Sequence, residues 1–369
     1  MNCRPVYDMM TQGVTQGVFP GGVLLCAKGE DIFFFEAFGL ADLMRAQPMK
    51  RDAVFDLASL TKPLATAAAM MVLVQEGRLG LHTCLDEVLH KGFGPGKAKI
   101  TMDMLLRHTS GLPAHRAFHT VIADCADPGQ ALIDAVLAEP LENPPGSCQI
   151  YSDLGFMLLC HVIETVTQQR LDQFVRDRVY TTLKIKDLFF IHLGTKLGTK
   201  LGTKPDIKDM SVDENRLVST RNCPWRDRVL TGEVEDENAW AAGGVQGHAG
   251  LFGDARSVHL LCMEILHGIR QESPRVLDPR ILTAFVTKYP GQTMVAGFDT
   301  PSVKGSSSGR YFSRKAVGHL GYTGTSFWMD PASGLLVILL TNRVHPSRSN
   351  EKIRKFRPAI HDCIARCIR

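Results

Sequence analysis

Apolar runs broken by short turns predict strands near both ends of the chain. GGVLLCA (21–27) and DIFFFEAFG (31–39) flank a Lys28-Gly29 turn and predict a β-hairpin. TSFWMD (325–330) and LLVILLTN (335–342) flank a Pro-Ala-Ser-Gly turn and predict a second hairpin. Because strands lie at both ends, we expect one sheet that both chain ends help to build.

Between these hairpins the apolar positions recur at helical spacing. Helices are expected over Ser59 to Glu76, Met102 to Arg107 after an N-cap at Thr101, and Tyr151 to Thr167, with a final helix from Glu351 to Ile368. The pattern predicts an α+β fold, an α/β sandwich with an antiparallel sheet flanked by helices. Residues 1–58 and 300–369 would form the sheet region, and residues 59–299 a mostly helical insertion with the active site at the junction.

Two segments cannot be assigned to a helix or a strand from this pattern. Residues 205–245 give no periodic pattern. LGTKLGTKLGTK (193–204) repeats a unit of four residues, which is too short for a solenoid, so we expect a surface loop lengthened by local duplication.

Composition narrows the protein class. The 369 residues are 44% hydrophobic and 22% charged, as in soluble globular proteins, and no stretch approaches the roughly 20 apolar residues of a membrane span. The net charge of +4 is small, and the basic cluster at Lys352, Arg354, Lys355 and Arg357 favours a solvated helix face over nucleic-acid binding. The sequence carries no readable sign of an oligomeric state.

Ten cysteines show no paired spacing, and several lie in apolar runs, as Cys26 and Cys160 do. Residues 1–17 lack the apolar core of a signal peptide. We therefore expect reduced thiols and a cytoplasmic protein, with no cofactor and no metal.

The candidate chemistry begins at FDLASLTKPLATAAAMM (55–71), where Ser59 and Lys62 are three residues apart at an expected helix start. A serine needs an adjacent base to become a nucleophile, and a lysine serves once burial lowers its pKa. An N-cap serine and a solvated lysine would give the same pattern. The small and apolar residues after Lys62 indicate a buried helix and favour the catalytic interpretation.

Several further motifs follow in order: HTSGLP (108–113), Tyr151-Ser152-Asp153, GGVQGHAGLF (243–252) and His319-Leu320-Gly321. With Ser59-Leu60-Thr61-Lys62, they resemble the β-lactamase-related serine hydrolases over roughly Gly21 to Asn342. That family includes class C β-lactamases, low-molecular-weight penicillin-binding DD-peptidases and SxxK carboxylesterases. The resemblance implies a β-lactamase/transpeptidase-like fold and an acyl-enzyme on Ser59.

The resemblance also implies roles for other residues. Tyr151 would face Ser59 and Lys62, with its phenolate favoured by the lysine, and act as base and then acid. The oxyanion hole would comprise the backbone N–H groups of Ser59 and of Tyr322, which follows Gly321 on an edge strand. Gly321 would let the substrate approach that strand closely.

Three departures from the family pattern bear on the substrate. The third residue of the family's Tyr-x-Asn motif is Asp153, which offers no amide donor for an acylamino carbonyl. The family's Lys-Thr-Gly motif is His319-Leu320-Gly321, so a cation becomes a mostly neutral imidazole and a hydroxyl is lost. These changes favour a carboxylesterase on small esters. A β-lactamase, a D-alanyl-D-alanine carboxypeptidase-like amide hydrolase and a catalytically silent binding protein remain alternatives.

Other features are given a structural interpretation. GSSSG (305–309) fits a nucleophile-elbow pattern around Ser307 but lacks the flanking strand and helix. GEVEDENAW (232–240) lacks the ligand spacing of a calcium loop, so a polar loop beside the cleft is expected. His108 and His248 are not accompanied by further residues at the spacing of zinc ligands. We therefore expect them to organise loops and a helix start.

Overall fold

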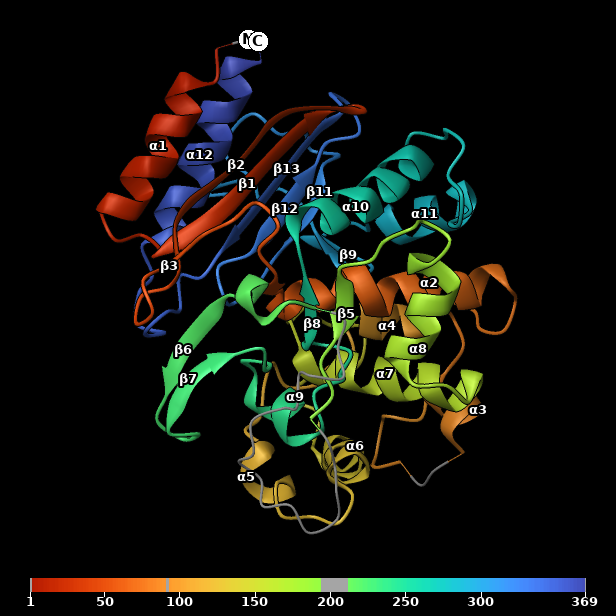
Figure 1. Cartoon of the computed structure of the whole chain (residues 1–369). Helices are drawn as coiled ribbons and strands as arrows, with labels where there is room; N and C mark the ends of the chain where they lie inside the picture. The colour runs from red at the N-terminus through yellow and green to blue at the C-terminus, as the bar shows by residue number, and fades with distance from the viewer. Residues whose placement is uncertain (1, 91–92, 194–211, 369) are drawn as a thin grey trace.

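The computed structural model describes residues 2–90, 93–193 and 212–368. Its main feature is an eight-stranded antiparallel sheet of order β3-β2-β1-β13-β12-β11-β10-β9 (Figure 1). The strands are β1 (Gly21–Lys28), β2 (Asp31–Asp42), β3 (Gln47–Pro48), β9 (Met294–Val295), β10 (Phe298–Asp299), β11 (Val317–Leu320), β12 (Ser326–Met329) and β13 (Leu335–Thr341).

Both predicted hairpins are present, as β1–β2 and β12–β13, and β1 pairs with β13 from Gly22–Thr341 to Lys28–Leu335. The two ends of the chain therefore share the centre of one sheet, as expected. The α+β fold and its antiparallel sheet are confirmed.

Helices cover both faces of this sheet. On one face, α1 (Arg4–Thr15) and α12 (Ile353–Cys367) lie side by side, and α10 (Ala255–Ile269) packs on the other (Figure 1). Side chains of β1 alternate between two cores, with Leu24 facing the α1–α12 side and Val23 and Leu25 the opposite side. This double burial explains why the central strands are continuously apolar.

The remaining elements build the helical region beneath the sheet. Its helices, with α11 beside α10, are α2 (Ala68–Gln75), α3 (Leu85–Leu89), α4 (Met102–Leu106), α5 (His119–Ile122), α6 (Pro128–Ala138), α7 (Asp153–Thr167), α8 (Leu171–Val175), α9 (Glu237–Ala241) and α11 (Pro279–Val286). Two small sheets comprise β4 (Phe55–Asp56), β5 (Leu188–Phe190) and β8 (Leu251–Gly253), and β6 (Ser219–Cys223) and β7 (Arg228–Thr231).

The predicted helices agree with the structure in place, but the segment from Ser59 to Glu76 divides into the 3-10 turn Ala58–Leu60, the π-helix Lys62–Ala67 and α2, and α7 begins two residues after Tyr151. Thr101 caps α4 by accepting from the Met104 N–H, and α12 begins two residues later than expected. The division of the chain at residues 58 and 300 remains a prediction, and β9 and β10 of the large sheet precede residue 300.

Within the described ranges, no helix is long and apolar enough to span a bilayer. Residues 194–204 of the LGTK repeat lie outside the described residues.

Asn342 connects the first strands to the last. It is buried, its Oδ1 accepts from the Gly21 N–H at 2.9 Å, and its Nδ2 donates to the carbonyls of Leu40 and Ala41 at 3.2 Å each. The Asn342 side chain thus forms hydrogen bonds with backbone groups of β1 and β2 just beyond the end of β13, where the backbone pairing between strands stops.

We predict that Asn342→Ala lowers the free energy of unfolding by about 3 kcal/mol, because three hydrogen bonds are lost and buried backbone groups remain unpaired. Urea denaturation followed by circular dichroism would measure the change. Lys28→Ala, at the exposed end of β1, serves as the control and should change stability little. Equal stability of Asn342→Ala and the control would contradict this role.

Candidate active site

Ser59 lies at a tightly held chain reversal between the sheet and the helical region. Residues Ala58–Leu60 form a 3-10 turn, and Asp56 Oδ1 accepts from the Ala58 N–H at 2.8 Å. Ala58 has a φ of 49°, a left-handed conformation that is costly for a residue with a Cβ. The Thr61 hydroxyl donates to the Ala58 carbonyl at 2.6 Å and helps to hold it. Strain is thus concentrated directly before Ser59.

Lys62 begins the π-helical turn Lys62–Ala67 and is fully buried. Its Nζ lies 3.1 Å from Ser59 Oγ, 2.7 Å from Asp153 Oδ1 and 3.1 Å from the His248 carbonyl oxygen. All three ammonium protons therefore have an acceptor. The expected proximity of Ser59 and Lys62 is confirmed by this geometry.

The expected lowering of the Lys62 pKa is wrong. Burial does lower it, but the charge of Asp153, the influence of Tyr151 and the Asp153 hydrogen bond together raise the pKa above its ordinary value. Burial raises the pKa of Asp153, and the Lys62 charge and the His115 hydrogen bond more than reverse this, so the carboxyl pKa is far below normal. Lys62 and Asp153 therefore form an ion pair at neutral pH.

Tyr151 lies two residues before the start of α7, beside this ion pair. Its ring centroid is 4.8 Å from Lys62 Nζ, 4.6 Å from the His108 ring and 5.9 Å from the His319 ring. Burial raises the pKa of Tyr151 to about 12, although Lys62 and a hydrogen bond with Ser59 lower it. The expected phenolate is therefore corrected to a neutral phenol in this resting structure.

His108 and Ser152 fix where α7 begins. His108 Nδ1 accepts from the Ser152 N–H at 3.0 Å, and Ser152 Oγ accepts from the Gly155 N–H as the N-cap. His248 Nε2 lies 3.0 Å from Asp236 Oδ1, while its carbonyl holds Lys62. The prediction that these two histidines organise loops and a helix start is confirmed.

The loop after β11 is tied to the backbone that precedes Ser59. Thr323 Oγ1 donates to the Asp56 carbonyl at 2.8 Å, and Thr325 Oγ1 donates to the Leu57 carbonyl at 3.0 Å. Within the described part of the chain, neither the Ser59 N–H nor the Tyr322 N–H donates to an acceptor. Both predicted oxyanion donors are thus available and lie on two segments that these threonines hold together.

Arg357 differs from the expected solvated helix face. It is 6% exposed, and its guanidinium donates to the carbonyls of Gly321 at 3.3 Å and Thr325 at 3.0 Å from α12. Burial lowers its pKa to about 10. The other three residues of that cluster, Lys352, Arg354 and Lys355, are exposed as expected. Arg357 therefore supports the back of the Tyr322 loop.

The β11 residues depart from expectation in two ways. β11 is not an edge strand, because β10 and β9 continue the sheet, although β10 pairs with it only at Asp299–Gly318. A Cβ on Gly321 would lie 2.0 Å from Thr325 Oγ1 and 2.7 Å from the Leu57 carbonyl oxygen. Glycine is therefore required here by protein packing, whereas the expectation concerned the approach of substrate.

His319 and Leu320 lie on β11, and the His319 ring is beside that of Tyr151. Burial, reinforced by the Lys62 charge, lowers the pKa of His319 to about 3, so the imidazole is neutral at pH 7 as expected. His319 Nδ1 lies 3.0 Å from the Leu320 carbonyl oxygen. The ring beside Tyr151 on β11 is thus a neutral imidazole.

Sequence reasoning missed two other participants in the site. His115 Nδ1 lies 3.4 Å from Asp153 Oδ2, and nothing in its sequence context indicated this contact. Asp56 accepts from the N–H groups of Ala58 and Glu235, and burial raises its pKa to about 7. A signal for Asp56 existed, since Asp two residues before a strained turn is typical of an Asx-turn.

The acidic segment 232–240 is more ordered than the predicted polar loop, because Asp236 caps α9 there. Glu233 and Glu235 are buried and paired with arginines, as in Glu233 with Arg228 at 2.8 Å. Ser307 lies in a loop against α12, where its carbonyl oxygen is 2.9 Å from His361 Nδ1.

A family model described as Beta-lactamase matches residues 6–360, so the chain belongs to the Beta-lactamase family of hydrolases. The chain is 30% identical over 371 residues to proteins named "Putative D-alanyl-D-alanine carboxypeptidase" from Salmonella typhimurium and Salmonella typhi. Each match covers 94% of this chain and 84% of the relative.

Solved structures share the fold at low sequence identity. A protein described as an octameric penicillin-binding protein homologue from Pyrococcus abyssi has a TM-score of 0.74 at 17% identity, over 100% of this chain and 78% of that one. EstCE1, described as a hydrolase with promiscuous acyltransferase activity, has a TM-score of 0.69 at 21% identity, over 96% of this chain and 98% of that one. The resemblance drawn from the motifs is confirmed at the level of family and fold.

We predict that the protein loses stability as the pH falls from 7 to 5, because two site histidines are buried in the neutral state. Burial, with a smaller effect of the Lys62 charge, lowers the pKa of His108 to about 3, and that of His319 is similarly low. The unfolded chain binds these protons below about pH 6.5, so each histidine costs about 2 kcal/mol at pH 5. Thermal unfolding at the two pH values measures the loss.

His108→Asn is the matched variant. Asparagine keeps an acceptor for the Ser152 N–H and tolerates the φ of 59° at this position. Its melting temperature should fall less between pH 7 and pH 5 than that of the unmodified chain. An identical fall in both proteins would exclude His108 as a source of the pH dependence.

Proposed function

We propose that this Beta-lactamase-family chain is a serine hydrolase of small neutral esters, with Ser59 as the acylated nucleophile. The contact of Lys62 Nζ with Ser59 Oγ at 3.1 Å and with Asp153 Oδ1 at 2.7 Å is the observation that carries the proposal. A buried ion pair against a serine hydroxyl, beside two free backbone N–H groups, supplies a proton acceptor and an oxyanion site. Tyr151 completes the set as the neutral acid beside them.

The raised pKa of Lys62 determines the order of the proton transfers. An ammonium cannot accept a proton, so Lys62 passes one of its protons to Asp153 as it receives the proton of Ser59. Ser59 Oγ then bonds to the acyl carbon, and the oxyanion is held by the N–H groups of Ser59 and Tyr322. As the ester bond breaks, the Tyr151 hydroxyl donates a proton to the departing alkoxide and is reprotonated by Lys62, which recovers its own proton from Asp153. Water repeats the sequence to release the acid.

The charges around Ser59 support a neutral substrate. Asp153 is ionised and occupies the motif position where the family carries an amide donor, so an acylamino carbonyl would face an acceptor. His319 is neutral at pH 7, and Leu320 has no hydroxyl. A substrate carboxylate would therefore find no cation on β11, whereas a small ester needs none.

A peptidase-like amide hydrolase is the second candidate. The relatives from Salmonella, at 30% identity, carry the name "Putative D-alanyl-D-alanine carboxypeptidase", and that activity would use the same Ser59 chemistry. The two candidates differ in the substrate carboxylate that the site must bind, so parallel substrates distinguish them.

We predict that the protein turns over a short-chain p-nitrophenyl ester and forms little or no adduct with a penicillin. Release of nitrophenol and intact-mass spectrometry on the same samples would measure both reactions. Rapid acylation and hydrolysis of penicillin would reject the ester preference. Reaction with neither compound would favour the binding-protein alternative.

Ser59→Ala should lower ester kcat at least about 10⁴-fold and abolish the covalent mass gain, because no nucleophile remains. Lys62→Ala should nearly abolish turnover. Ser307→Ala is the control and should retain normal activity, since Ser307 lies against α12. Normal turnover by Ser59→Ala would remove Ser59 from the mechanism.

We predict that Asp153→Asn lowers ester kcat/KM at pH 7 and makes it rise with pH, because the variant lacks the carboxylate that accepts the Lys62 proton and can turn over only through the neutral amine. Asp153 raises the pKa of Lys62, so its removal leaves burial to lower that pKa, and the neutral amine forms about 1–3 pH units earlier. A pH profile of ester hydrolysis measures the change.

The control for this change is Glu36→Gln, which breaks an exposed ion pair with Arg51. It should leave the profile unchanged, because an exposed pair exerts little field at a distance. Superimposable profiles for Asp153→Asn and the unmodified chain would mean that the ion pair does not govern the titration of Lys62.

A further inference from the structure

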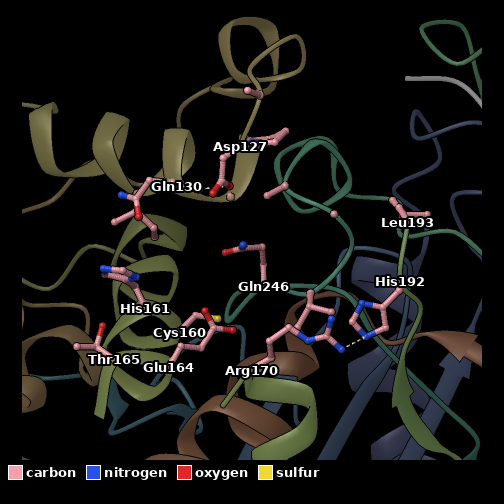
Figure 2. A pocket seen from close by; sticks show the side chains of 17 residues that line it. Asp127, Gln130, Cys160, His161, Glu164, Thr165, Arg170, His192, Leu193 and Gln246 are labelled. Atoms are coloured by element: carbon pink, nitrogen blue, oxygen red, sulfur yellow. Dashed lines mark hydrogen bonds between the residues drawn. The ribbon is translucent and has the colours of Figure 1, made fainter. Parts of the chain in front are cut away.

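A cavity of about 770 Å³ adjoins the loop 242–246. The two residues after this loop contact Thr66 and Lys62 through their carbonyl groups. The walls of the cavity are the loop 126–130 at the start of α6, one face of α7, and the loop 242–246 after α9 (Figure 2). Neither Ser59 nor Lys62 lines it. The volume is that of a small-molecule site, and neither the known family activity nor the proposed ester hydrolysis uses it.

Gln246 marks this cavity as a binding site. The residue is 7% exposed, and its Oε1 is buried with no hydrogen-bond partner. Figure 2 shows the side chain projecting from its loop into the space between the labelled wall residues. A buried acceptor without a donor costs free energy, and a ligand that carries an N–H group would remove that cost.

The charges on the walls indicate the sign of the ligand. Asp127 and Glu164 line the cavity. The Asp127 carboxylate accepts from the Gln130 N–H at 2.9 Å, and the Glu164 carboxylate accepts from the Leu171 N–H at 3.1 Å and from the Cys160 thiol. No guanidinium or ammonium pairs with either carboxylate within the described part of the chain.

The cation on the wall is already neutralised. Arg170 makes two hydrogen bonds to Asp172, at 3.1 and 3.0 Å, and a third contact to His192 Nε2 at 2.8 Å (Figure 2). His192 Nε2 also lies 2.7 Å from Asp172. Among the described carboxylates that line the cavity, Asp127 and Glu164 have no guanidinium partner, and they lie beside the imidazoles of His161 and His192, so the lining favours a cation.

We propose that this cavity binds a small cationic amine, whose N–H groups bond to Gln246 Oε1 and whose charge is balanced by Asp127 and Glu164. The segment that follows Gln246 contacts the active site, because the Gly247 carbonyl accepts from Thr66 at 2.7 Å and the His248 carbonyl from Lys62 at 3.1 Å. The bound amine therefore lies two residues along the chain from an acceptor of Lys62.

Isothermal titration calorimetry on the full chain with 1,5-diaminopentane tests the proposal. Glutarate, a dianion of the same length, and 1,5-pentanediol, a neutral analogue, are the comparison compounds. We expect one diamine per chain and no measurable binding of the other two. Absence of diamine binding at millimolar concentration, or binding of glutarate instead, would overturn the proposal.

Gln246→Leu keeps the side-chain volume and removes the acceptor. It should weaken diamine binding at least tenfold and raise the melting temperature of the free protein, since the unpaired acceptor is gone. A purely structural Gln246 would give the opposite change in stability. Unchanged diamine affinity in this variant would place the amine elsewhere and reject the site.

Two further variants keep the test decisive if Gln246→Leu does not fold. Asp127→Asn retains an acceptor for the Gln130 N–H but loses the charge, and it should weaken binding severalfold. Ser59→Ala should bind the diamine as the unmodified chain does. Loss of binding in Ser59→Ala would mean that the amine occupies the active site, whereas failure of ester hydrolysis alone leaves this result unaffected.

Discussion

The buried ion pair between Lys62 and Asp153 is the interaction around which the site is organised. An ammonium without water around it is stable only where every proton has an acceptor, and Ser59, Asp153 and the His248 carbonyl supply them. These three acceptors come from the 3-10 turn, the start of α7 and the loop before β8. Lys62 therefore fixes the relative positions of three segments that are far apart in the sequence, and the chemistry depends on that convergence.

A second constraint joins the sheet to the nucleophile. Thr323 and Thr325 donate to the two carbonyls directly before the turn of Ser59, and Arg357 holds the same loop from behind. The free N–H groups of Ser59 and Tyr322 thus belong to one hydrogen-bonded unit, although they lie on different elements. Preorganised donors of this kind need no rearrangement when negative charge develops between them. The sheet's contribution to the proposed chemistry is this rigidity.

Much of this arrangement could be predicted, because strands, helices and the Ser59–Lys62 pair each correspond to a regular spacing of residues in the sequence. Continuous apolar runs gave both hairpins, and the three-residue spacing placed Lys62 beside Ser59. The electrostatic state could not be predicted, because a pKa depends on neighbours from other elements. Asp153 is 91 residues away from Lys62, and its charge reverses the effect of burial. The same limit applies to Arg357, which has the same sequence context as three exposed basic residues and is buried by the β11 loop above it.

The identity of residue 153 links charge to substrate choice. With an amide at this position, Lys62 would have no anionic partner, burial would favour its neutral form, and the amide N–H would be free for a substrate carbonyl. With Asp153, the lysine keeps its proton and the carboxylate is occupied by Lys62 and His115. In the proposed mechanism, residue 153 therefore offers no donor to a substrate carbonyl and instead accepts a proton from Lys62. His319 on β11 is neutral as well, and the proposed preference for a neutral ester rests on these two residues together.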